Sequence, residues 1–283
     1  MAAPRRAMWR RIDDDAGRRL TLPEPPTRIV SLVPSVTELI CHLGAAERLV
    51  GVTRFCSEPA AVVARLARVG GTKTPLRERI AALRPDLVVL NSEENRHEDF
   101  AALQADGTPL FVSFTTSVAG AAASVERLGA ALGSDTAAAA LSAAIGAARS
   151  AAVAAVDVRR RVFCPIWRRP WMSFNRDTYC HDLLACAGGD SVCADATTRY
   201  PSLVLEAVAA AAPQVILLPD EPYPFADRHR GELGPLAETP AVQAGRVHLV
   251  DGKALSWYGP RTPGALEAFQ RLISGPDRPR PGS

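Results

Sequence analysis

The chain has 283 residues, of which 47% are hydrophobic and 22% charged, with a formal net charge of +3. This composition is typical of a folded globular protein with enough apolar side chains for one large core or two ordinary ones. Basic and acidic residues alternate along most of the chain, which leaves no continuous positive surface for a phosphate backbone. Nucleic acid is therefore excluded as an expected partner.

Short apolar strands alternate with helical patterns from residue 28 onward. A β-branched run at 28–33 precedes a helical pattern that ends at Gly44, and a second short strand follows at 49–53. A helix through Ile80 and Leu83 then leads to a fully apolar strand at 87–90. The repeated order of strand and helix predicts a parallel sheet covered by helices on both faces.

The second half repeats this pattern. We expect strands at 161–166 and 215–218, with helices at 177–187 and 203–212 between them. The segment 84–93 (RPDLVVLNSE) also matches 212–221 (APQVILLPDE) element by element, since a proline precedes an apolar strand and polar residues follow it. The chain is therefore expected to contain two related lobes.

An alanine-dominated segment at 117–156 separates the two halves, and 135–156 reads as one long helix. We predict an α/β fold of two Rossmann-like lobes with parallel sheets, joined by a single long interlobe helix. The predicted boundaries are 1–116 for the first lobe, 117–158 for the linker and helix, and 159–283 for the second lobe. A helical joint of this kind predicts only small closing motions.

Ligands of parallel α/β sheets bind beyond the carboxyl ends of the strands, so the loops there are the expected site. These loops carry many aromatic and polar side chains, which favours a bulky, flat small molecule held between the lobes; the alternative is that the rings are ordinary core. Predicted ligand-binding residues from loop position are Arg54, Phe55, Cys56, Thr72, Glu94, Arg96, Phe114, Trp167, Trp171, Tyr179, Glu221, Tyr223 and Trp257.

Some of these residues indicate specific chemistry. Arg54 and Arg96 are suited to a phosphate or carboxylate of the ligand, because guanidinium groups form paired hydrogen bonds with oxyanions. Cys56 and His97 are possible axial ligands of a bound metal, with an inert thiol and a solvated histidine as the alternatives. The six cysteines form no CxxC pair and are expected to be mostly reduced core residues.

Five segments in a fixed order carry a family resemblance. They are 28–38 (RIVSLVPSVTE), 69–72 (VGGT), 84–88 (RPDLV), 186–190 (CAGGD) and Trp257. Together they resemble the substrate-binding proteins of cobalamin and iron-siderophore importers, over about residues 18–273. The resemblance implies two α/β lobes, a connecting helix and a pocket lined by Pro34, Ser35, Phe55, Trp167, Trp171 and Trp257.

The resemblance also implies a ligand and a partner. Aromatic residues, serine and threonine outnumber arginine in the expected loops, which favours a corrinoid such as cobalamin over an anionic iron chelate. An ABC permease would be the partner of a monomeric binding protein that needs no cofactor of its own. The first docking acid would be Glu98, whereas the second-lobe position near 258–260 has no acid. A cytosolic carrier of the corrinoid is therefore the alternative to a component of an ABC-type uptake system.

Location is predicted from the N-terminus. Arg5, Arg6, Arg10 and Arg11 are followed by Asp13, Asp14 and Asp15 rather than by the apolar run of a signal peptide. The sequence as it stands therefore predicts a cytoplasmic protein, with an extracytoplasmic protein as the alternative if a leader has been removed.

Two other functions remain open. The first is binding of an iron-siderophore or of haem. The second is a nucleotide-dependent transferase with two Rossmann-like lobes. The transferase is disfavoured because 33–36 (VPSV) follows the first strand in place of a glycine-rich phosphate loop, so we expect no enzymatic activity.

Overall fold

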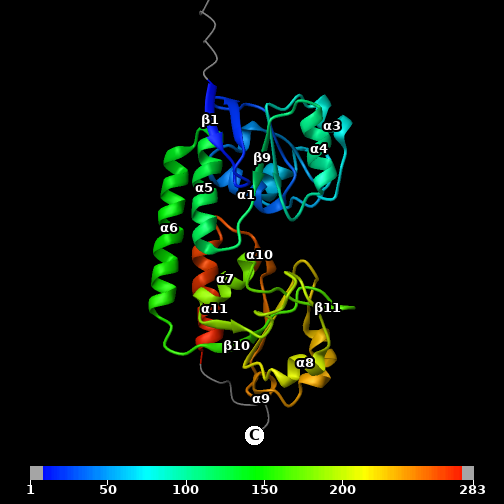
Figure 1. The fold of residues 1–283 in the computed structure, drawn as a ribbon, viewed down its shortest axis with the longest axis vertical. Coiled ribbons are helices and arrows are strands. Elements are labelled where there is room, and N and C mark those ends of the chain that lie inside the picture. Colours follow the sequence, from blue (N-terminus) through cyan, green and yellow to red (C-terminus); the bar gives the residue numbers. More distant parts are fainter. Residues whose placement is uncertain (1–8, 276–283) are drawn as a thin grey trace, which may run out of the picture. The chain divides into compact units, whose positions relative to one another are not determined.

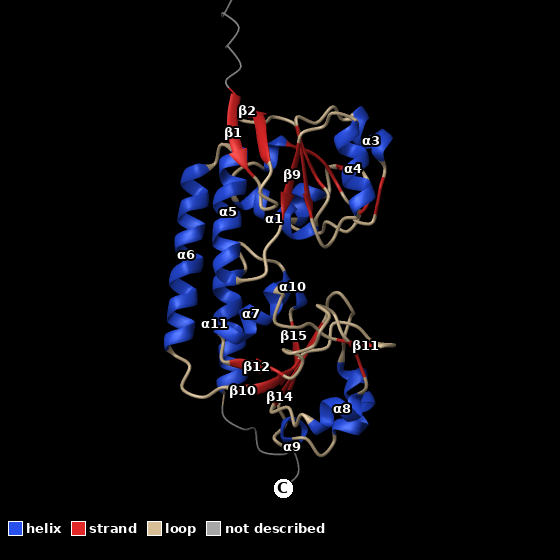
Figure 2. Cartoon of the chain, viewed as in Figure 1, coloured by secondary structure: helices blue, strands red, loops and turns tan. Residues whose placement is uncertain are grey.

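The computed structural model describes residues 9–275 and divides the chain into two compact units (Figure 1). Unit 1 contains the residues up to Thr115 together with Gly120–Ala143, and unit 2 contains Thr116–Ala119 and the residues from Ala144 onward. The division between units falls inside the long alanine-rich helix, whereas the sequence analysis places its boundaries at 116 and 159. Both units combine helices with a central sheet (Figure 2).

The sheet of unit 1 is parallel throughout, which confirms the prediction. Its order is β5-β4-β3-β8-β9, and the strands are β3 (Ile29–Ser31), β4 (Leu49–Val52), β5 (Ala67–Arg68), β8 (Leu87–Asn91) and β9 (Leu110–Ser113). Every residue of β3, β8 and β9 is buried. Such continuous burial is typical of parallel strands with helices on both faces.

Five helical segments between residues 34 and 105 pack beside the sheet of unit 1. They are α1 (Pro34–His42), η1 (Ala46–Arg48), α2 (Ala60–Val63), α3 (Arg77–Ala82) and α4 (His97–Ala105). Proline fits the first turn of α1 because its fixed φ is helical and no N–H is needed there. Apolar residues of α3 and α4, such as Ile80 and Leu103, pack with Val88 and Leu90 in one core cluster.

A two-stranded antiparallel hairpin opens the described chain and was not predicted. It consists of β1 (Trp9–Asp13) and β2 (Arg19–Pro23), with Ile12 and Leu22 buried. The turn between them contains Asp14 and Asp15.

The alanine-rich segment forms two helices, α5 (Val118–Leu132) and α6 (Asp135–Ala154), and α6 corresponds to the predicted long helix. By length and apolar composition alone α6 passes as a membrane span. Its buried residues are Ala138, Leu141, Ile145 and Ala152. These lie on one side of the helix, the pattern of a helix packed along a protein surface.

The sheet of unit 2 is also parallel and has the order β12-β10-β14-β15. Its strands are β10 (Arg160–Phe163), β12 (Gly189–Ser191), β14 (Val215–Pro219) and β15 (Val247–Val250), and a separate antiparallel pair joins β11 (Trp171–Met172) to β13 (Ser202–Leu203). The strand predicted at 161–166 ends at Phe163. Pro165, two residues later, has no N–H to donate to a neighbouring strand.

Helices cover this sheet as well. They are α7 (Tyr179–Cys186), α8 (Leu205–Ala210), η2 (Asp227–Leu236), α9 (Pro240–Gln243), α10 (Gly252–Ser256) and α11 (Thr262–Ser274). A core cluster that includes Phe163, Val208, Ile216 and Leu236 joins the sheet to α8 and η2. The parallel order aligns the carboxyl ends of β10, β14 and β15, so the loops that follow them meet at one edge of unit 2.

Candidate functional site

The loops at the carboxyl edge of the unit 1 sheet carry most of the residues predicted for the first lobe. Pro34 and Ser35 follow β3, and Arg54 and Phe55 follow β4. Phe55 is 53% exposed, and the guanidinium carbon of Arg54 lies 4.8 Å from its ring centroid. A Cβ at Gly71 would lie 3.2 Å from the Phe55 ring and 3.3 Å from Arg54, so the absence of a side chain at Gly71 leaves room for them.

Cys56 is the clearest correction at this edge. We expected its thiol to face a ligand, but it is only 2% exposed. Its Sγ lies 3.2 Å from the hydroxyls of both Thr37 and Thr53, and the Cys56 N–H donates to Thr53 O, which turns the side chain inward. Burial raises the pKa of the Cys56 thiol, which disfavours the thiolate that a metal requires.

Asn95 links three loops of this edge and was missed by the sequence analysis. Its amide nitrogen donates to Thr72 O at 2.8 Å and to Leu32 O at 3.3 Å, and its Oδ1 accepts from the Asn91 N–H at 2.8 Å. Asn95 is 7% exposed. One buried amide therefore holds together the loops that follow β3, β8 and the short strand β6 (Gly70–Gly71). The only signal in the sequence is its place in the loop after the β8 strand.

The predicted residues Glu94, Arg96 and His97 lie in the loop after β8 or at the start of α4. Arg96 is exposed and pairs with Glu98 at 3.2 Å, and the exposed His97 ring stacks on Phe100 with centroids 6.2 Å apart. A pocket of about 260 Å³ opens beside them, between α4 and the hairpin turn. Its walls include Arg18, Asn91, Asn95, Arg96, His97 and Phe100.

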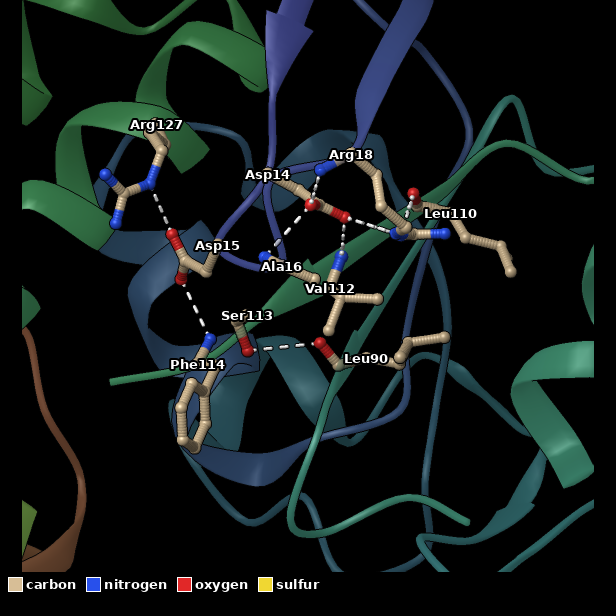
Figure 3. A network of polar contacts seen from close by, with 10 residues as sticks. All are labelled: Asp14, Asp15, Ala16, Arg18, Leu90, Leu110, Val112, Ser113, Phe114 and Arg127. Carbon is tan, nitrogen blue, oxygen red and sulfur yellow. Dashed lines mark hydrogen bonds and ion pairs between the residues drawn. The ribbon is translucent and has the colours of Figure 1, made fainter. Parts of the chain in front are cut away.

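The N-terminal hairpin fixes the exit of β9, where the predicted residue Phe114 lies (Figure 3). The Phe114 N–H donates to Asp15 at 2.8 Å, and Ser124 and Arg127 of α5 also donate to this carboxylate. Neither the Asp14 nor the Asp15 side chain is exposed. The sequence analysis used these aspartates only to argue against a signal peptide, although buried carboxylates need such partners.

Unit 2 gathers an aromatic cluster, defined as Trp167, Trp171, Tyr223, Phe225 and His229. Trp167 meets Tyr223 edge to face at 5.7 Å, and Trp171 lies parallel to Phe225 at 5.8 Å. Trp167 is 44% exposed and Trp171 and Tyr223 are half-buried. The cluster spans the loops after β10 and β14, so it offers wide apolar faces at the expected edge.

The hydroxyl of Tyr223 is held by two further side chains that the sequence analysis missed. Arg168 donates to it at 3.1 Å, and Nε2 of His229 lies 3.3 Å away. The other ring nitrogen of His229 accepts from the Ala226 N–H at 2.9 Å. Glu232 forms an ion pair with Arg168, so the Tyr223 ring has a fixed orientation.

Trp257 and Glu221 lie together but are less exposed than expected. The Trp257 side chain is buried, its indole N–H donates to Glu221 Oε1 at 2.9 Å, and Lys253 and Arg261 approach its ring. Burial raises the pKa of Glu221, while the hydrogen bond from Trp257 opposes this rise. Trp257 thus packs against its own unit, and Glu221 holds it there.

Tyr179 is also buried, contrary to the sequence analysis. We expected it to face a ligand, but it begins α7 and is only 5% exposed, with its hydroxyl 2.8 Å from that of Thr262. Burial raises the pKa of this phenol. Tyr179 connects α7 to α11 inside unit 2.

Comparison with known proteins identifies the family of the chain. The family model described as periplasmic binding protein matches residues 29–254. The chain belongs to this family. A vitamin B12-binding protein of Vibrio cholerae is 26% identical over 270 residues, covering 90% of this chain and 91% of that protein. An uncharacterised ABC transporter substrate-binding lipoprotein of Bacillus subtilis is 27% identical over 277 residues, covering 93% and 84%.

Solved structures show the same fold. The periplasmic vitamin B12-binding protein of Vibrio cholerae superposes with a TM-score of 0.78 at 25% identity, covering 88% of this chain and 97% of that one. A periplasmic haem-binding protein of Roseiflexus sp. RS-1 gives 0.77 at 28% identity, covering 87% and 97%. The predicted two-lobed α/β class is confirmed.

Family membership settles the class of function and corrects the location. The chain is a substrate-binding protein of the ABC-transporter type, a class that binds small ligands and docks on permeases, and it is not an enzyme. The expectation of a cytoplasmic protein is wrong, because these relatives are periplasmic proteins or lipoproteins. The missing apolar run after the N-terminal arginines was a poor guide to location.

Proposed function

We propose that the chain binds a corrinoid such as cobalamin at the loops that follow the strands of its sheets. The aromatic cluster of unit 2 is the observation that carries this proposal, because Trp167, Trp171 and Tyr223 offer partly exposed ring faces on one edge. A corrin macrocycle is wide and largely apolar on its faces, so ring contact and shape supply most of its recognition. The named vitamin B12-binding relatives support the same ligand class.

The loops of unit 1 suit the amide and phosphate groups around such a macrocycle. Thr72 and Glu94 offer hydrogen-bonding groups, and Arg54 and Arg96 are assigned to an anionic substituent of the ligand. Ser35, which the sequence analysis also placed in the pocket, is only 5% exposed and packs within α1. Phe55, with Arg54 stacked on it, provides an exposed ring at this edge. Phe114 completes the set, since its backbone is fixed by Asp15.

Haem is the second candidate ligand, because the haem-binding protein of Roseiflexus is 28% identical to this chain and equally similar in fold. Haem and corrinoids share a flat macrocycle, so the aromatic cluster fits both. His97, exposed beside the pocket of unit 1, is retained as a possible axial ligand for a bound metal.

Titration of the purified protein with cyanocobalamin, cobinamide and haemin tests this proposal. Absorbance gives the dissociation constants, and the melting temperature gives an independent reading, because a ligand at about 100 times its Kd stabilises the folded state by roughly 2.7 kcal/mol. We expect cyanocobalamin and cobinamide to raise the melting temperature more than haemin. If haemin alone binds, the second candidate replaces the first, and if none binds, the macrocycle proposal is wrong.

We further propose that the protein works as a monomer and that Glu98 is its docking acid on unit 1. Glu98 lies in the first turn of α4 and is exposed. A hydrogen bond from its own backbone N–H and the nearby Arg96 lower its pKa, so it is charged at neutral pH. Light scattering of the purified chain tests the monomer. Loss of transport-dependent ligand uptake in Glu98→Ala, with ligand affinity unchanged, tests the docking role.

A further inference from the structure

The hydroxyl group of Tyr223 lies in the loop that follows β14, at the carboxyl edge of the unit 2 sheet. Tyr223 is half-buried, and exposed Trp167 contacts its ring edge to face. Two side chains reach the phenolic oxygen, with Nη1 of Arg168 at 3.1 Å and Nε2 of His229 at 3.3 Å. They are the hydrogen-bonding partners that the described residues 9–275 give this oxygen. What Tyr223 offers to a ligand depends on which group donates in each contact.

Arg168 can only donate to the Tyr223 oxygen. A guanidinium group carries hydrogen on every nitrogen and has no acceptor. Glu232 forms an ion pair with Arg168 and holds the guanidinium beside Tyr223. Arg168 therefore uses a lone pair of the phenolic oxygen and leaves the phenolic proton unused.

A backbone contact fixes the tautomer of His229. The Ala226 N–H donates to Nδ1 at 2.9 Å, so this ring nitrogen presents a lone pair and carries no proton. A neutral imidazole has one protonated and one bare nitrogen, which assigns the proton of His229 to Nε2. His229 is only 2% exposed, so its ring is shielded from solvent that could replace this contact. The Nε2–H group consequently also donates to Tyr223.

Both neighbours thus donate to the same oxygen, and neither takes the proton of Tyr223. A hydroxyl group donates one hydrogen bond as well as accepting others. This proton is available to an acceptor outside the protein, which is water in the free chain and the ligand in the complex. Donors on the oxygen also polarise the O–H bond, because linked hydrogen bonds strengthen one another.

The two groups that hold the hydroxyl add no net charge. Arg168 is balanced by Glu232, and His229 with a single ring proton is neutral. An uncharged acceptor matches this position, because an incoming carboxylate would lose its water without gaining an unpaired positive charge. Carboxamide oxygens are uncharged acceptors, and a corrin macrocycle carries several of them around its rim.

We propose that Tyr223 is a specificity-determining residue whose O–H donates to a carboxamide oxygen at the rim of the bound macrocycle. The inference rests on the proposed function and adds a requirement to it. The ligand must present this oxygen beside the face that contacts Trp167 and the rest of the aromatic cluster. Arg168 and His229 are positioning residues, since they direct the proton of Tyr223 away from themselves.

Absorbance titration of Tyr223→Phe with cyanocobalamin and cobinamide tests the donor. The variant keeps the ring and loses only the hydroxyl group, so the Kd of both ligands should rise roughly two- to tenfold. Cobinamide retains the carboxamides but lacks the nucleotide phosphate, so a rise confined to cyanocobalamin would overturn the carboxamide assignment. Tyr179→Phe is the matched control, because its hydroxyl contacts Thr262 inside unit 2, and its Kd should equal that of wild type.

The titrations separate failure of this inference from failure of the proposed function. Wild-type affinity of Tyr223→Phe for both corrinoids would refute the role of the hydroxyl and leave corrinoid binding in place. Binding of neither corrinoid by the wild-type chain would remove the proposed ligand and the carboxamide assignment together.

The tautomer of His229 gives a second measurement that needs no ligand. Long-range correlation spectra of the whole protein labelled with ¹⁵N-histidine distinguish a protonated ring nitrogen from a bare one, and His229→Gln identifies the signals. At neutral pH we expect the proton on Nε2 and none on Nδ1. A proton on Nδ1 alone would make Nε2 the acceptor of the Tyr223 proton and would overturn the inference.

Discussion

The indole N–H of Trp257 donates to the carboxylate of Glu221 at 2.9 Å and joins the exits of β14 and β15 in unit 2. This carboxylate is half-buried, and burial raises its pKa above the usual 4.5. The pair therefore holds a ring in place at the cost of keeping an ionisable group out of water.

Replacing Glu221 by glutamine should change how stability depends on pH. A carboxyl group whose pKa is raised by folding favours the folded state most below its unfolded pKa, and this contribution is lost as the pH rises through the folded pKa. The glutamine side chain would still accept a hydrogen bond from Trp257 but would not ionise. Between about pH 4.5 and pH 7 we expect the free energy of unfolding of Glu221→Gln to rise relative to wild type.

Urea unfolding followed by tryptophan fluorescence at several pH values measures this difference. Glu206→Gln, an exposed residue in the first turn of α8, is the matched control and should follow the wild-type curve. Parallel curves for Glu221→Gln and wild type would contradict the role given to Glu221.

Trp167→Ala should weaken macrocycle binding with little effect on folding. Trp167 is 44% exposed and contacts Tyr223. Loss of one ring contact with the ligand is worth about 0.5–1.5 kcal/mol, or roughly a two- to tenfold rise in Kd. Trp9→Ala removes an exposed tryptophan from β1 and should leave Kd unchanged. Equal affinities for the two variants, measured by absorbance titration, would remove Trp167 from the site.

Asn95→Ala should destabilise the chain and loosen the loops of unit 1. It leaves Thr72 O, Leu32 O and the Asn91 N–H without their partner, and each unsatisfied buried group costs about 1–3 kcal/mol. Asn95→Asp retains the acceptor for Asn91 but not the two donors, so its free energy of unfolding should lie between those of wild type and Asn95→Ala. Ser92→Ala, an exposed neighbour, is the control. Wild-type unfolding of Asn95→Ala in urea would refute this.

Asp15→Asn should cost more stability than Asp13→Asn. The Asp15 side chain is fully buried and accepts from Phe114, Ser124 and Arg127, and each buried group that loses its partner costs about 1–3 kcal/mol. Asp13 is exposed and pairs with exposed Arg19, an interaction worth about 0–1 kcal/mol. Chemical denaturation of both variants provides the comparison, and equal losses would show that the buried carboxylate does not anchor β9.

Two glycines in the alanine-rich helices should respond oppositely to alanine. A Cβ at Gly129 of α5 would overlap that of Ala138 in α6, whereas a Cβ at Gly146 of α6 meets nothing within 4 Å. Gly129→Ala should therefore destabilise by about 1–3 kcal/mol. Gly146→Ala should stabilise by about 1 kcal/mol through helix propensity. Thermal unfolding of both variants measures these shifts, and a stabilising Gly129→Ala would argue against close packing of α5 on α6.

The fold was predictable where a local pattern has one physical solution. Continuous apolar runs such as 87–90 form buried parallel strands, and the 3.6-residue repeat of 135–156 gives α6. The hairpin of β1 and β2 was missed because its alternation is short and its exposed positions carry arginines. Its stability comes from carboxylate contacts with β9, about 100 residues away along the chain, which no local pattern reveals.

The orientation of the site residues likewise depends on contacts that no local sequence pattern reveals. Trp167, Trp171 and Tyr223 lie in one aromatic cluster, as loop position indicates, but the loops also turn Cys56 and Tyr179 inward. Their orientation depends on partners such as Thr37 and Thr262, which are distant in sequence. Asn95 and His229 organise their loops through backbone hydrogen bonds, and residue type alone does not distinguish such residues from solvated ones.

The hairpin turn covers backbone groups of the edge strand of the unit 1 sheet. β9 is the outer strand, and its Val112 and Phe114 N–H groups donate to Asp14 and Asp15, while Val112 O accepts from the Asp15 N–H. Negative side chains thus occupy the backbone groups to which another strand would add. The occupied backbone groups prevent β9 from pairing with a strand of another molecule. Removal of the residues before Thr27 would therefore expose an unpaired edge strand and make the chain prone to aggregate.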